Sequence, residues 1–495
     1  MLFIDSLLAA LSPFTLAMNF VGVMLGMIVG ALPGLGSVVA ITICLPFTFG
    51  MPSVSAIALL LGVYCGSICG GSIAAVLINT PGTPQSAATA FDGYPMARAG
   101  KPGKAIVWAL AASIFGGVFS CVILTFAAPQ IAVFALQFGP LETCALILMG
   151  LTCISSVSAN NQFKGLAMGV LGLLLACVGM SPFSAESRFT FDIFALNSGI
   201  DLVAVIVGVF ALSEVLDRVE RMRREARVEN GTSCRVQFPS LGEWRGRMSG
   251  LVKSSLIGTF VGILPGTGAA TAAFLSYGEA RRSSPRRENI GKGEPDGIIA
   301  AESSNNAVTG GALVPSLALG IPGEPVMALM LATLTLHGIT PGVRLMADNP
   351  DIVYSTFLSL ILANLLIIPT AIITVRGFGK LIKFPTAILL SIIVICSLLG
   401  VYLPRSNMFD VWMALLIGVI AFLMRFADFP VAPFLIGYVL SAQLEYRLGQ
   451  AVIYKGDMPL TEYLFSAPVA LVLFAVSACL LLAPMLRPLW AGRRK

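Results

Sequence analysis

The sequence contains very little charge for its length. Only 11% of its 495 residues are Asp, Glu, Lys or Arg, whereas soluble domains carry about 25%. Apolar residues make up 57% of the chain, and the mean hydropathy is +0.89. This composition excludes a soluble enzyme and a disordered scaffold, and it predicts an all-α polytopic membrane protein embedded in the lipid bilayer. At roughly 20 residues per helical crossing plus loops, the chain can hold about ten to twelve crossings.

Sequence motifs of membrane enzymes and pumps are missing as well. The chain has no HExxH, no GxSxG and no Walker A loop, and His337 is its single histidine. Because metalloproteases, serine hydrolases and ATP-driven pumps lose their usual support, we predict no enzymatic activity and no cofactor. The ten cysteines lack the paired spacing of a metal site, and no nucleic-acid motif is present. The first basic residue is Arg98, so we also expect no cleavable signal peptide.

The few charges are concentrated in the middle of the chain. Twenty-four of the 56 charged residues lie between Glu214 and Asp296, on both sides of an apolar island at residues 251–277. Because basic loops stay on the cytoplasmic side, a single crossing by this island would place one basic cluster outside. We therefore expect a re-entrant hairpin whose tip is LPGTG (264–268), where Pro and Gly end the helix. The same rule places the loop 92–105 and the C-terminal tail inside, and the segments 182–198, 403–410 and 445–463 outside.

This hairpin tip has a counterpart near the N-terminus. LPGLG (32–36) matches LPGTG (264–268) at an offset of 232 residues, and a GxxxG spacing precedes each. A second pair follows in the same order, because GGSIAAVLINTPGTP (70–84) aligns with GGALVPSLALGIPGEP (310–325) at an offset of 240 that becomes 241. Basic residues flank only the second tip, so the two repeats are predicted to be inverted. Paired Gly- and Pro-interrupted segments in inverted repeats are typical of secondary transporters.

The duplication and the charged middle divide the chain into four parts. Residues 1–217 are the predicted first transmembrane repeat, 218–249 a basic cytoplasmic connector, and 250–448 the second, inverted repeat. Residues 449–495 are predicted to form a C-terminal transmembrane helix and a basic cytoplasmic tail. Re-entrant tips in inverted repeats favour the hypothesis of an elevator-type motion, in which the elements that carry the motifs slide against a scaffold.

The interrupted segments can bind ions without charged side chains. A helix that ends inside the membrane leaves N–H groups free at one end and carbonyl groups at the other, which favour anions and cations respectively. INTPGTPQSA (78–87) and AESSNNAVTGG (301–311) add hydroxyl and amide groups that can bind a carboxylate or Na⁺. The alternative is that Gly and Pro only kink the helices and that Ser and Asn satisfy the freed backbone groups. The predicted substrate-binding residues are Pro33, Gly34, Gly36, Asn79, Thr80, Pro81, Gly82, Thr83, Ser86, Pro265, Gly266, Gly268, Asn305, Asn306, Pro322 and Gly323.

Three acidic residues in or near apolar segments are candidates for cation binding: Glu302, Glu324 and Asp92. A carboxylate at membrane depth is costly, so such residues are functional candidates by default. The alternative is that they lie at the membrane interface and only cap helices. Glu302, together with Ser303 and Ser304, is the predicted Na⁺ site, and H⁺ is the other possible coupling ion.

Three segments carry a resemblance to a known family: PGLGSVVAITICLPFTFG (33–50), YCGSICGGSIAAVLINTPGTPQSAATAFDGYPMARAG (64–100) and AESSNNAVTGGALVPSLALGIPG (301–323). They resemble the large membrane subunit of tripartite tricarboxylate transporters, the TctA family, and the resemblance extends from about Gly22 to Gly456. It implies carboxylate uptake across a bacterial inner membrane. A periplasmic solute-binding protein would deliver the substrate, citrate for example, a small four-helix membrane subunit would accompany the chain, and symport with a cation, usually Na⁺, would drive import. Glu324 departs from the pattern, since a small residue is expected after GIPG.

Three functions remain open at this point. The first is a cation-coupled carboxylate importer that needs its partners, and the second is a self-sufficient secondary transporter of another organic anion, or a channel. The third, a membrane-embedded enzyme, would need a general base that the Ser, Thr and Asn residues of the motifs do not supply. Few basic residues lie in apolar segments, so we expect helix N-termini and neutral donors to hold the anion. These features leave open which carboxylate is bound.

Overall fold

The computed structural model describes residues 2–157, 162–181, 183, 186–222, 237–381 and 385–491. Within these residues the chain is helical almost throughout, and the single pair of antiparallel strands has two residues in each strand. The structure therefore confirms the predicted all-α polytopic membrane fold. Residues 223–236 of the predicted connector lie outside the described residues.

The helices and strands follow one another in two runs, before and after the connector. The first run comprises α1 (Leu2–Ala10), α2 (Pro13–Gly30), α3 (Gly36–Cys44), η1 (Leu45–Thr48), α4 (Ser53–Ile78), η2 (Pro84–Ser86), α5 (Ala87–Arg98), α6 (Pro102–Ala135), α7 (Pro140–Val157), α8 (Gln162–Ala176), β1 (Gly179–Met180), β2 (Ser187–Arg188), η3 (Phe194–Ser198), α9 (Leu202–Ile206), the π-helical η4 (Val207–Leu212) and α10 (Ser213–Met222). The second run comprises α11 (Leu241–Arg245), α12 (Met248–Ile263), α13 (Gly268–Ser283), η5 (Arg287–Asn289), α14 (Pro295–Leu319), α15 (Pro325–Leu336), α16 (Leu345–Asp348), α17 (Pro350–Leu381), α18 (Thr386–Arg405), α19 (Met408–Phe426), α20 (Val431–Lys455), α21 (Leu460–Ser466) and α22 (Pro468–Ala491).

Six helices in the described part of the chain are long and apolar enough to cross a membrane: α2, α4, α6, α17, α18 and α19. The pair α21 and α22, bent by 100°, would make a seventh span. Shorter apolar helices, such as α12 and α15, adjoin the interrupted segments. Because broken helices can also reach membrane depth when neighbours satisfy their backbone, the ten to twelve crossings stay a prediction.

All four predicted helix interruptions occur. The first tip (32–36) separates α2 from α3 and the second tip (264–268) separates α12 from α13, while the first break (79–83) follows α4 and the second break (320–324) follows α14. The two tips have the same backbone geometry, since the φ angles of Gly34 and Gly36 are 81° and 69° and those of Gly266 and Gly268 are 85° and 70°. Glycine adopts such positive φ angles without steric cost, which explains why both tips repeat the same glycine spacing.

In both halves, the helix before the tip packs closely along the helix before the break, and we call this pair of helices the packing frame. In the first half, α2 lies along α4 so closely that a Cβ atom on Gly22, Gly26 or Gly30 would collide with the backbone of Leu59, Val63 or Ser67. In the second half, α12 lies along α14 in the same way, with Gly258 against Ser304 and Gly262 near Val308. In each pair, glycines with higher residue numbers on one helix contact residues with higher numbers on the other helix, so the two helices run parallel. Small residues permit such close helix contact in membranes.

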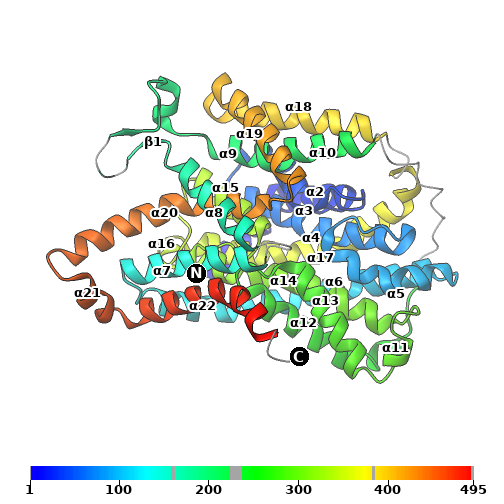
Figure 1. Ribbon diagram of the computed structural model, residues 1–495. Coiled ribbons are helices and arrows are strands. Elements are labelled where there is room, and N and C mark those ends of the chain that lie inside the picture. The colour runs from blue at the N-terminus through cyan, green and yellow to red at the C-terminus, as the bar shows by residue number, and fades with distance from the viewer. Residues whose placement is uncertain are drawn as a thin grey trace.

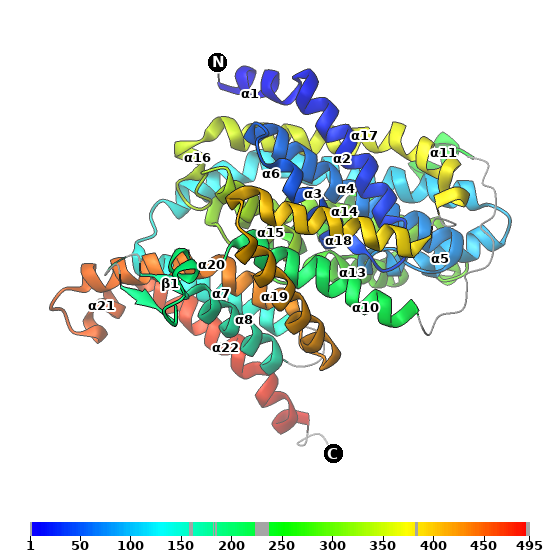
Figure 2. The same cartoon turned by 90° about the horizontal axis from the view of Figure 1, so that it is seen from above.

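Two groups of helices lie side by side, and a further set formed by α9, η4, α10, α18 and α19 packs beside them (Figures 1 and 2). In the first group α4 and α14 are buried along nearly their whole length and are covered by α2, α6, α12, α13 and α17. The second group contains α7, α8, α20 and α22, which pack on one another. Each group combines helices from both halves of the sequence, so the two repeats interlock.

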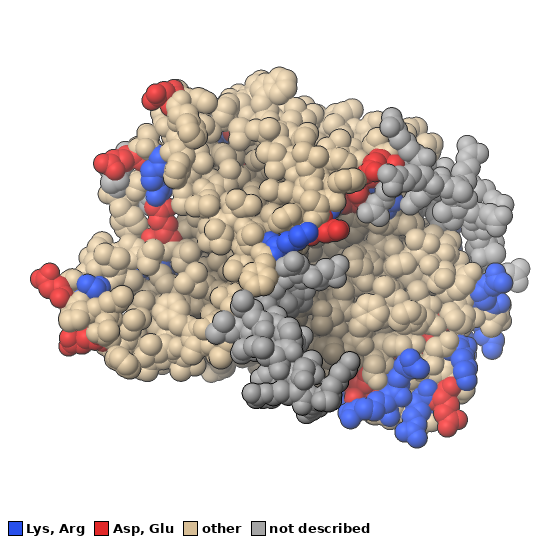
Figure 3. All heavy atoms as spheres, viewed as in Figure 1, with Lys and Arg blue, Asp and Glu red and all other residues tan. Residues whose placement is uncertain are grey.

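Charged side chains are scarce on the face of the molecule drawn in Figure 3, where most of the visible surface is uncharged. Lys and Arg residues gather at one corner, which carries α11, α12 and α13 in Figure 1. An uncharged surface with basic residues at one end is typical of a membrane protein whose basic loops face one side.

Candidate functional site

Each tip contacts the break of its own half. The amide of Gly82 donates to the carbonyl of Gly71 (3.4 Å), and a Cβ atom on Gly82 would collide with the carbonyl oxygen of Gly30 at the end of α2. In the second half, the Gly266 amide donates to the carbonyl of Gly323 (2.7 Å). In both halves the break lies against the end of the helix before the tip, since a Cβ atom on Gly323 would lie 3.2 Å from the carbonyl oxygen of Gly262 on α12. Only the second half also joins a predicted tip glycine, Gly266, to a predicted break glycine, Gly323.

The two breaks differ in exposure, although their sequences are similar. In the first break the side chains of Asn79 and Thr80 are exposed, while Thr83 and Ser86 are buried and cap η2 through their own hydrogen bonds. In the second break every residue from 320 to 324 is buried, including Pro322 and Gly323. Only the first break thus presents polar groups to the surroundings, whereas both tips are partly exposed at Pro33, Gly34, Gly36, Pro265, Gly266 and Gly268.

Glu302 lies at the centre of a buried polar cluster that joins the two halves. Its side chain on α14 is fully buried. Ser72 of α4 donates to Oε1 (2.6 Å), Ser113 of α6 donates to Oε2 (2.8 Å), and Thr89 of α5 donates to Oε1 as well. Three helices of the first half therefore each supply one hydroxyl to a single carboxylate of the second half.

Asn305 and Asn306 follow Glu302 by about one turn of α14 and are also fully buried. The Asn306 amide nitrogen donates to the carbonyl of Ser113 (2.7 Å) and to Oδ1 of Asn364 on α17 (2.6 Å), whereas its Oδ1 has no hydrogen-bond partner among the described residues. Neither side-chain polar atom of Asn305 has a partner there. Unsatisfied amides in a buried site are costly, so they favour a ligand or ion over a purely structural role.

Ser303 and Ser304 point away from Glu302. Ser303 donates to the carbonyl of Ile299 on its own helix (2.8 Å), and Ser304 donates to the carbonyl of Ala272 on α13 (3.0 Å). Successive residues of an α-helix are rotated by about 100°, so neighbours in sequence face different helices. The structure thus groups Glu302 with Ser72, Thr89 and Ser113, none of which the sequence analysis selected. Their only signal is a hydroxyl in a stretch rich in Ala and Gly.

The other two acidic candidates bind backbone groups. Oδ1 of Asp92 accepts hydrogen bonds from the amides of Gly291, Gly293 and Glu294, each at 2.8 Å, directly before α14. Glu324 accepts from the Ala269 amide at the start of α13 (3.3 Å) and from the Tyr64 hydroxyl. Asp92 thus holds the turn that precedes α14, and Glu324 lies at the N-terminus of α13.

Two further contacts describe how the halves meet. On α4, Tyr64 comes before Ser72, but their partners come in the reverse order, because Glu324 follows Glu302 along the chain. This reversal is expected if α4 and α14 pass each other in antiparallel directions. Arg218 on α10 donates to the carbonyl of Pro33 at the first tip. This guanidinium was not among the predicted residues, because its position in the charged connector gave no sign that it reaches the tip.

Comparison with known proteins agrees with these features. Residues 16–436 match the family described as the tripartite tricarboxylate transporter TctA family. An uncharacterized 52.8 kDa protein in the TAR-I ttuC' 3' region of Agrobacterium vitis is 36% identical over 477 residues, which cover 96% of this chain and 94% of that protein. An uncharacterized protein in the TAR-II ttuC' 3' region of the same organism is 33% identical over 201 residues, covering 40% of this chain and 83% of that protein. No solved structure matches the chain.

Proposed function

Because the chain belongs to the tripartite tricarboxylate transporter TctA family, we propose that it is the large permease subunit of a cation-coupled importer of tricarboxylates or related carboxylates. Family membership and the apolar helices support a multi-pass membrane transporter. The proposal adds the partners and the location. A periplasmic solute-binding protein delivers the substrate, a small four-helix membrane subunit accompanies the chain, and the complex lies in the bacterial inner membrane with this chain's C-terminus in the cytoplasm.

The observation that carries the coupling is the environment of Glu302. A fully buried carboxylate on α14 faces hydroxyls from α4, α5 and α6. A carboxylate in such a place either takes up a proton or shares a cation with nearby oxygens, and hydroxyl groups serve both cases because they can donate or accept. In the proposal, Na⁺ or H⁺ at Glu302 stabilises the contact between the two halves and so favours one conformation of the carrier.

The substrate is proposed to bind beside the first tip and the first break. The exposed groups there include the amide of Asn79, the hydroxyl of Thr80 and the backbone at Gly34. Arg218 adds a positive charge at the same tip. Guanidinium, amide and hydroxyl donors together suit a carboxylate, which only accepts hydrogen bonds.

An elevator motion is the proposed mechanism of alternating access. Its basis is the division into two packed groups, one around α4 and α14 and one formed by α7, α8, α20 and α22. The first group carries both tips, both breaks and Glu302, so it is the proposed mobile part. Exposure of the first break alone supports a carrier that opens its site on one side at a time.

Reconstitution tests the proposal. Uptake of labelled citrate is measured in proteoliposomes that contain this chain and its small membrane partner, with and without the solute-binding protein and an inward Na⁺ gradient. We expect uptake only when both are present. Uptake by this chain alone would favour the self-sufficient carrier. Equal uptake with a proton gradient in the absence of Na⁺ would show that the coupling ion is H⁺ and not Na⁺.

A further inference from the structure

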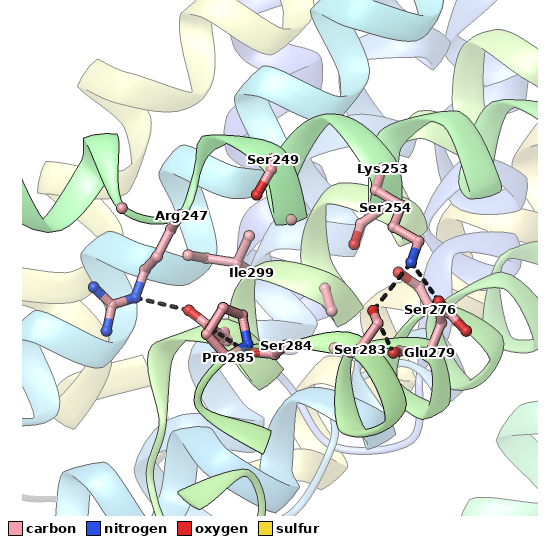
Figure 4. A pocket seen from close by; sticks show the side chains of 15 residues that line it. Arg247, Ser249, Lys253, Ser254, Ser276, Glu279, Ser283, Ser284, Pro285 and Ile299 are labelled. Carbon is pink, nitrogen blue, oxygen red and sulfur yellow. Dashed lines mark hydrogen bonds and ion pairs between the residues drawn. The ribbon is translucent and has the colours of Figure 1, made fainter. Parts of the chain in front are cut away.

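A polar cavity of about 280 Å³ lies at the open end of the second hairpin, away from the tips and breaks. Its walls come from the start of α12, the C-terminal half of α13 and the start of α14 (Figure 4). Five serines line it: Ser249, Ser254, Ser276, Ser283 and Ser284. Ser283 and Ser284 already donate to the Glu279 carbonyl and to the Asp296 carboxylate, which leaves Ser249, Ser254 and Ser276 as hydroxyl donors for a ligand.

Lys253 reaches across this cavity from α12 to α13 (Figure 4). Its ammonium group pairs with Glu279 and donates to the Ser283 hydroxyl (3.0 Å). Glu279 has a second basic partner, because Arg282 Nε lies 2.8 Å from its other carboxylate oxygen. Lys253 can therefore turn toward a ligand without leaving Glu279 unpaired.

Ser276 supplies a donor that the protein itself does not use. Its side chain is 1% exposed and lines the cavity, and its hydroxyl has no hydrogen-bond partner among the described residues. Ser254, 4% exposed, lines the same cavity from α12. A buried hydroxyl without a partner costs free energy, so its presence in a cavity points to a polar ligand.

Apolar side chains continue from the cavity along the hairpin. Leu256 and Phe260 stand three and seven residues after Lys253, on the same face of α12, and are 50% and 64% exposed. On α13, Leu275 stands four residues before Glu279 and is 55% exposed. The surface near the cavity is basic, because Lys and Arg outnumber Asp and Glu by eight to five between Glu243 and Asp296 (Figure 3). The cavity lining itself pairs two basic side chains, Arg247 and Lys253, with two acidic ones, Asp296 and Glu279. A polar pocket within a basic surface that continues into an exposed apolar face fits a headgroup and its acyl chains.

We propose that this cavity binds the phosphate group of an anionic phospholipid. Lys253, Ser254 and Ser276 donate to the phosphate oxygens, and the acyl chains lie along the face of α12 that carries Leu256 and Phe260. Phosphate suits these donors because a Lys charge and several hydroxyls can share its oxygens. Bound lipid would hold the limbs α12 and α13 together at their open end and leave the second tip free.

Native mass spectrometry of the purified full chain tests the proposal. The protein is titrated with phosphatidylglycerol, with phosphatidylcholine and, separately, with inorganic phosphate. We expect at least one phosphatidylglycerol to bind at about tenfold lower concentration than phosphatidylcholine, and Lys253→Gln to abolish this difference. Ser276→Ala should weaken phosphatidylglycerol binding about threefold, and Lys253→Arg should retain it.

Arg282→Gln is the matched control, because Arg282 shares Glu279 with Lys253 but is 80% exposed and does not line the cavity. Equal loss of phosphatidylglycerol in Arg282→Gln and Lys253→Gln would overturn the proposal in favour of diffuse attraction to the basic corner. Displacement of phosphatidylglycerol by millimolar inorganic phosphate would overturn it in favour of a site for a free anion. A folded Lys253→Gln protein that keeps its lipid preference would also overturn it.

Discussion

The helices α4 and α14 occupy corresponding places in the two halves but use them differently. Both are buried, and both pack in parallel against a glycine-bearing helix. Where α14 carries Glu302 through Asn306, the aligned residues 62–66 of α4 are Gly, Val, Tyr, Cys and Gly. The packing frame is thus common to both halves, whereas the ionisable and amide groups belong to the second. A duplicated frame sets the geometry, and one half is then free to carry the chemistry.

The breaks that follow these helices differ in the same way. The first is exposed at Asn79 and Thr80, and the second is sealed, with Glu324 bound between Tyr64 and the N-terminus of α13. Equivalent segments of an inverted repeat are therefore in different environments within one conformation. Such asymmetry is what alternating access requires of a symmetric fold.

The largest effect is expected from substitutions that disrupt the close glycine packing of α2 on α4 or of α12 on α14. Gly26→Leu and Gly258→Leu place side chains where the backbones of Val63 and Ser304 lie, and each should cost about 3 kcal/mol of folding free energy. We expect both variants to lose the monodisperse peak in detergent size-exclusion chromatography. Gly250→Ala is the control, because a Cβ atom there meets nothing within 4 Å. If only one of the two glycine variants lost its monodisperse peak, the idea that both halves depend on the same helix packing would be contradicted.

The second prediction isolates the chemistry that only α14 carries. Glu302→Gln keeps the shape and removes the negative charge: its amide oxygen can still accept from Ser72, and its NH2 group can donate to the Ser113 hydroxyl. We expect cation-driven uptake to fall about 100-fold while thermal stability stays close to that of the wild type. The exposed Glu462→Gln on α21 serves as the control. Unchanged coupled uptake in Glu302→Gln would place the coupling ion elsewhere.

A smaller effect is expected at the exposed first break. Asn79 has a φ angle of 52°, a conformation that Gly adopts without cost and Ala adopts at about 1 kcal/mol. Asn79→Gly should therefore leave the melting temperature unchanged and reduce uptake about tenfold through loss of the amide. Gly320→Ala, at a φ angle of 73° in the sealed break, should instead lower the melting temperature. Normal uptake by Asn79→Gly would remove Asn79 from the substrate site.

The smallest effect concerns an ion pair that joins the halves at their edge. Lys104 of α6 lies 2.5 Å from Glu243 of α11 and, with the Ser240 amide, holds the pKa of Glu243 at about 2, below its ordinary 4.5. Because the folded-state pKa is lowered, the pair stabilises the protein at neutral pH, and this contribution is lost as the pH falls from about 4.5 towards 2.

Both side chains are partly exposed, so the contribution should stay within about 1 kcal/mol. Lys104→Met should lower the melting temperature slightly at pH 7 and by less at pH 3. A constant difference between the variant and the wild type across this range would show that lost packing of the Lys104 stem, and not charge, is responsible.

Local signals in the sequence predicted the interruptions, because Pro and Gly act within a few residues of where they stand. The offset between the tips likewise predicted a duplication. The partners of Glu302 could not be predicted in this way, since Ser72, Thr89 and Ser113 lie 230, 213 and 189 residues away along the chain. Ser303 and Ser304 stand beside Glu302 in the sequence, but Ser303 donates to a carbonyl of its own helix and Ser304 donates to α13.

The sequence also could not predict which of the two breaks is exposed and which is buried. GTP at 82–84 and GEP at 323–325 share Gly and Pro at the same spacing, and burial depends on which helices cover them. The cation site and the substrate site stay predictions, now with a defined set of neighbours around Glu302 and around the first tip.

Asp92 has a mechanical consequence for any moving carrier. Its carboxylate binds three amides of the turn ahead of α14, those of Gly291, Gly293 and Glu294, while Thr89, one turn earlier on α5, binds Glu302. Two attachments on one short helix prevent α5 from sliding or rotating relative to α14. In the proposed elevator motion, α5 and α14 would therefore move together as one rigid unit, and the shear would lie at the boundary with α7, α8, α20 and α22.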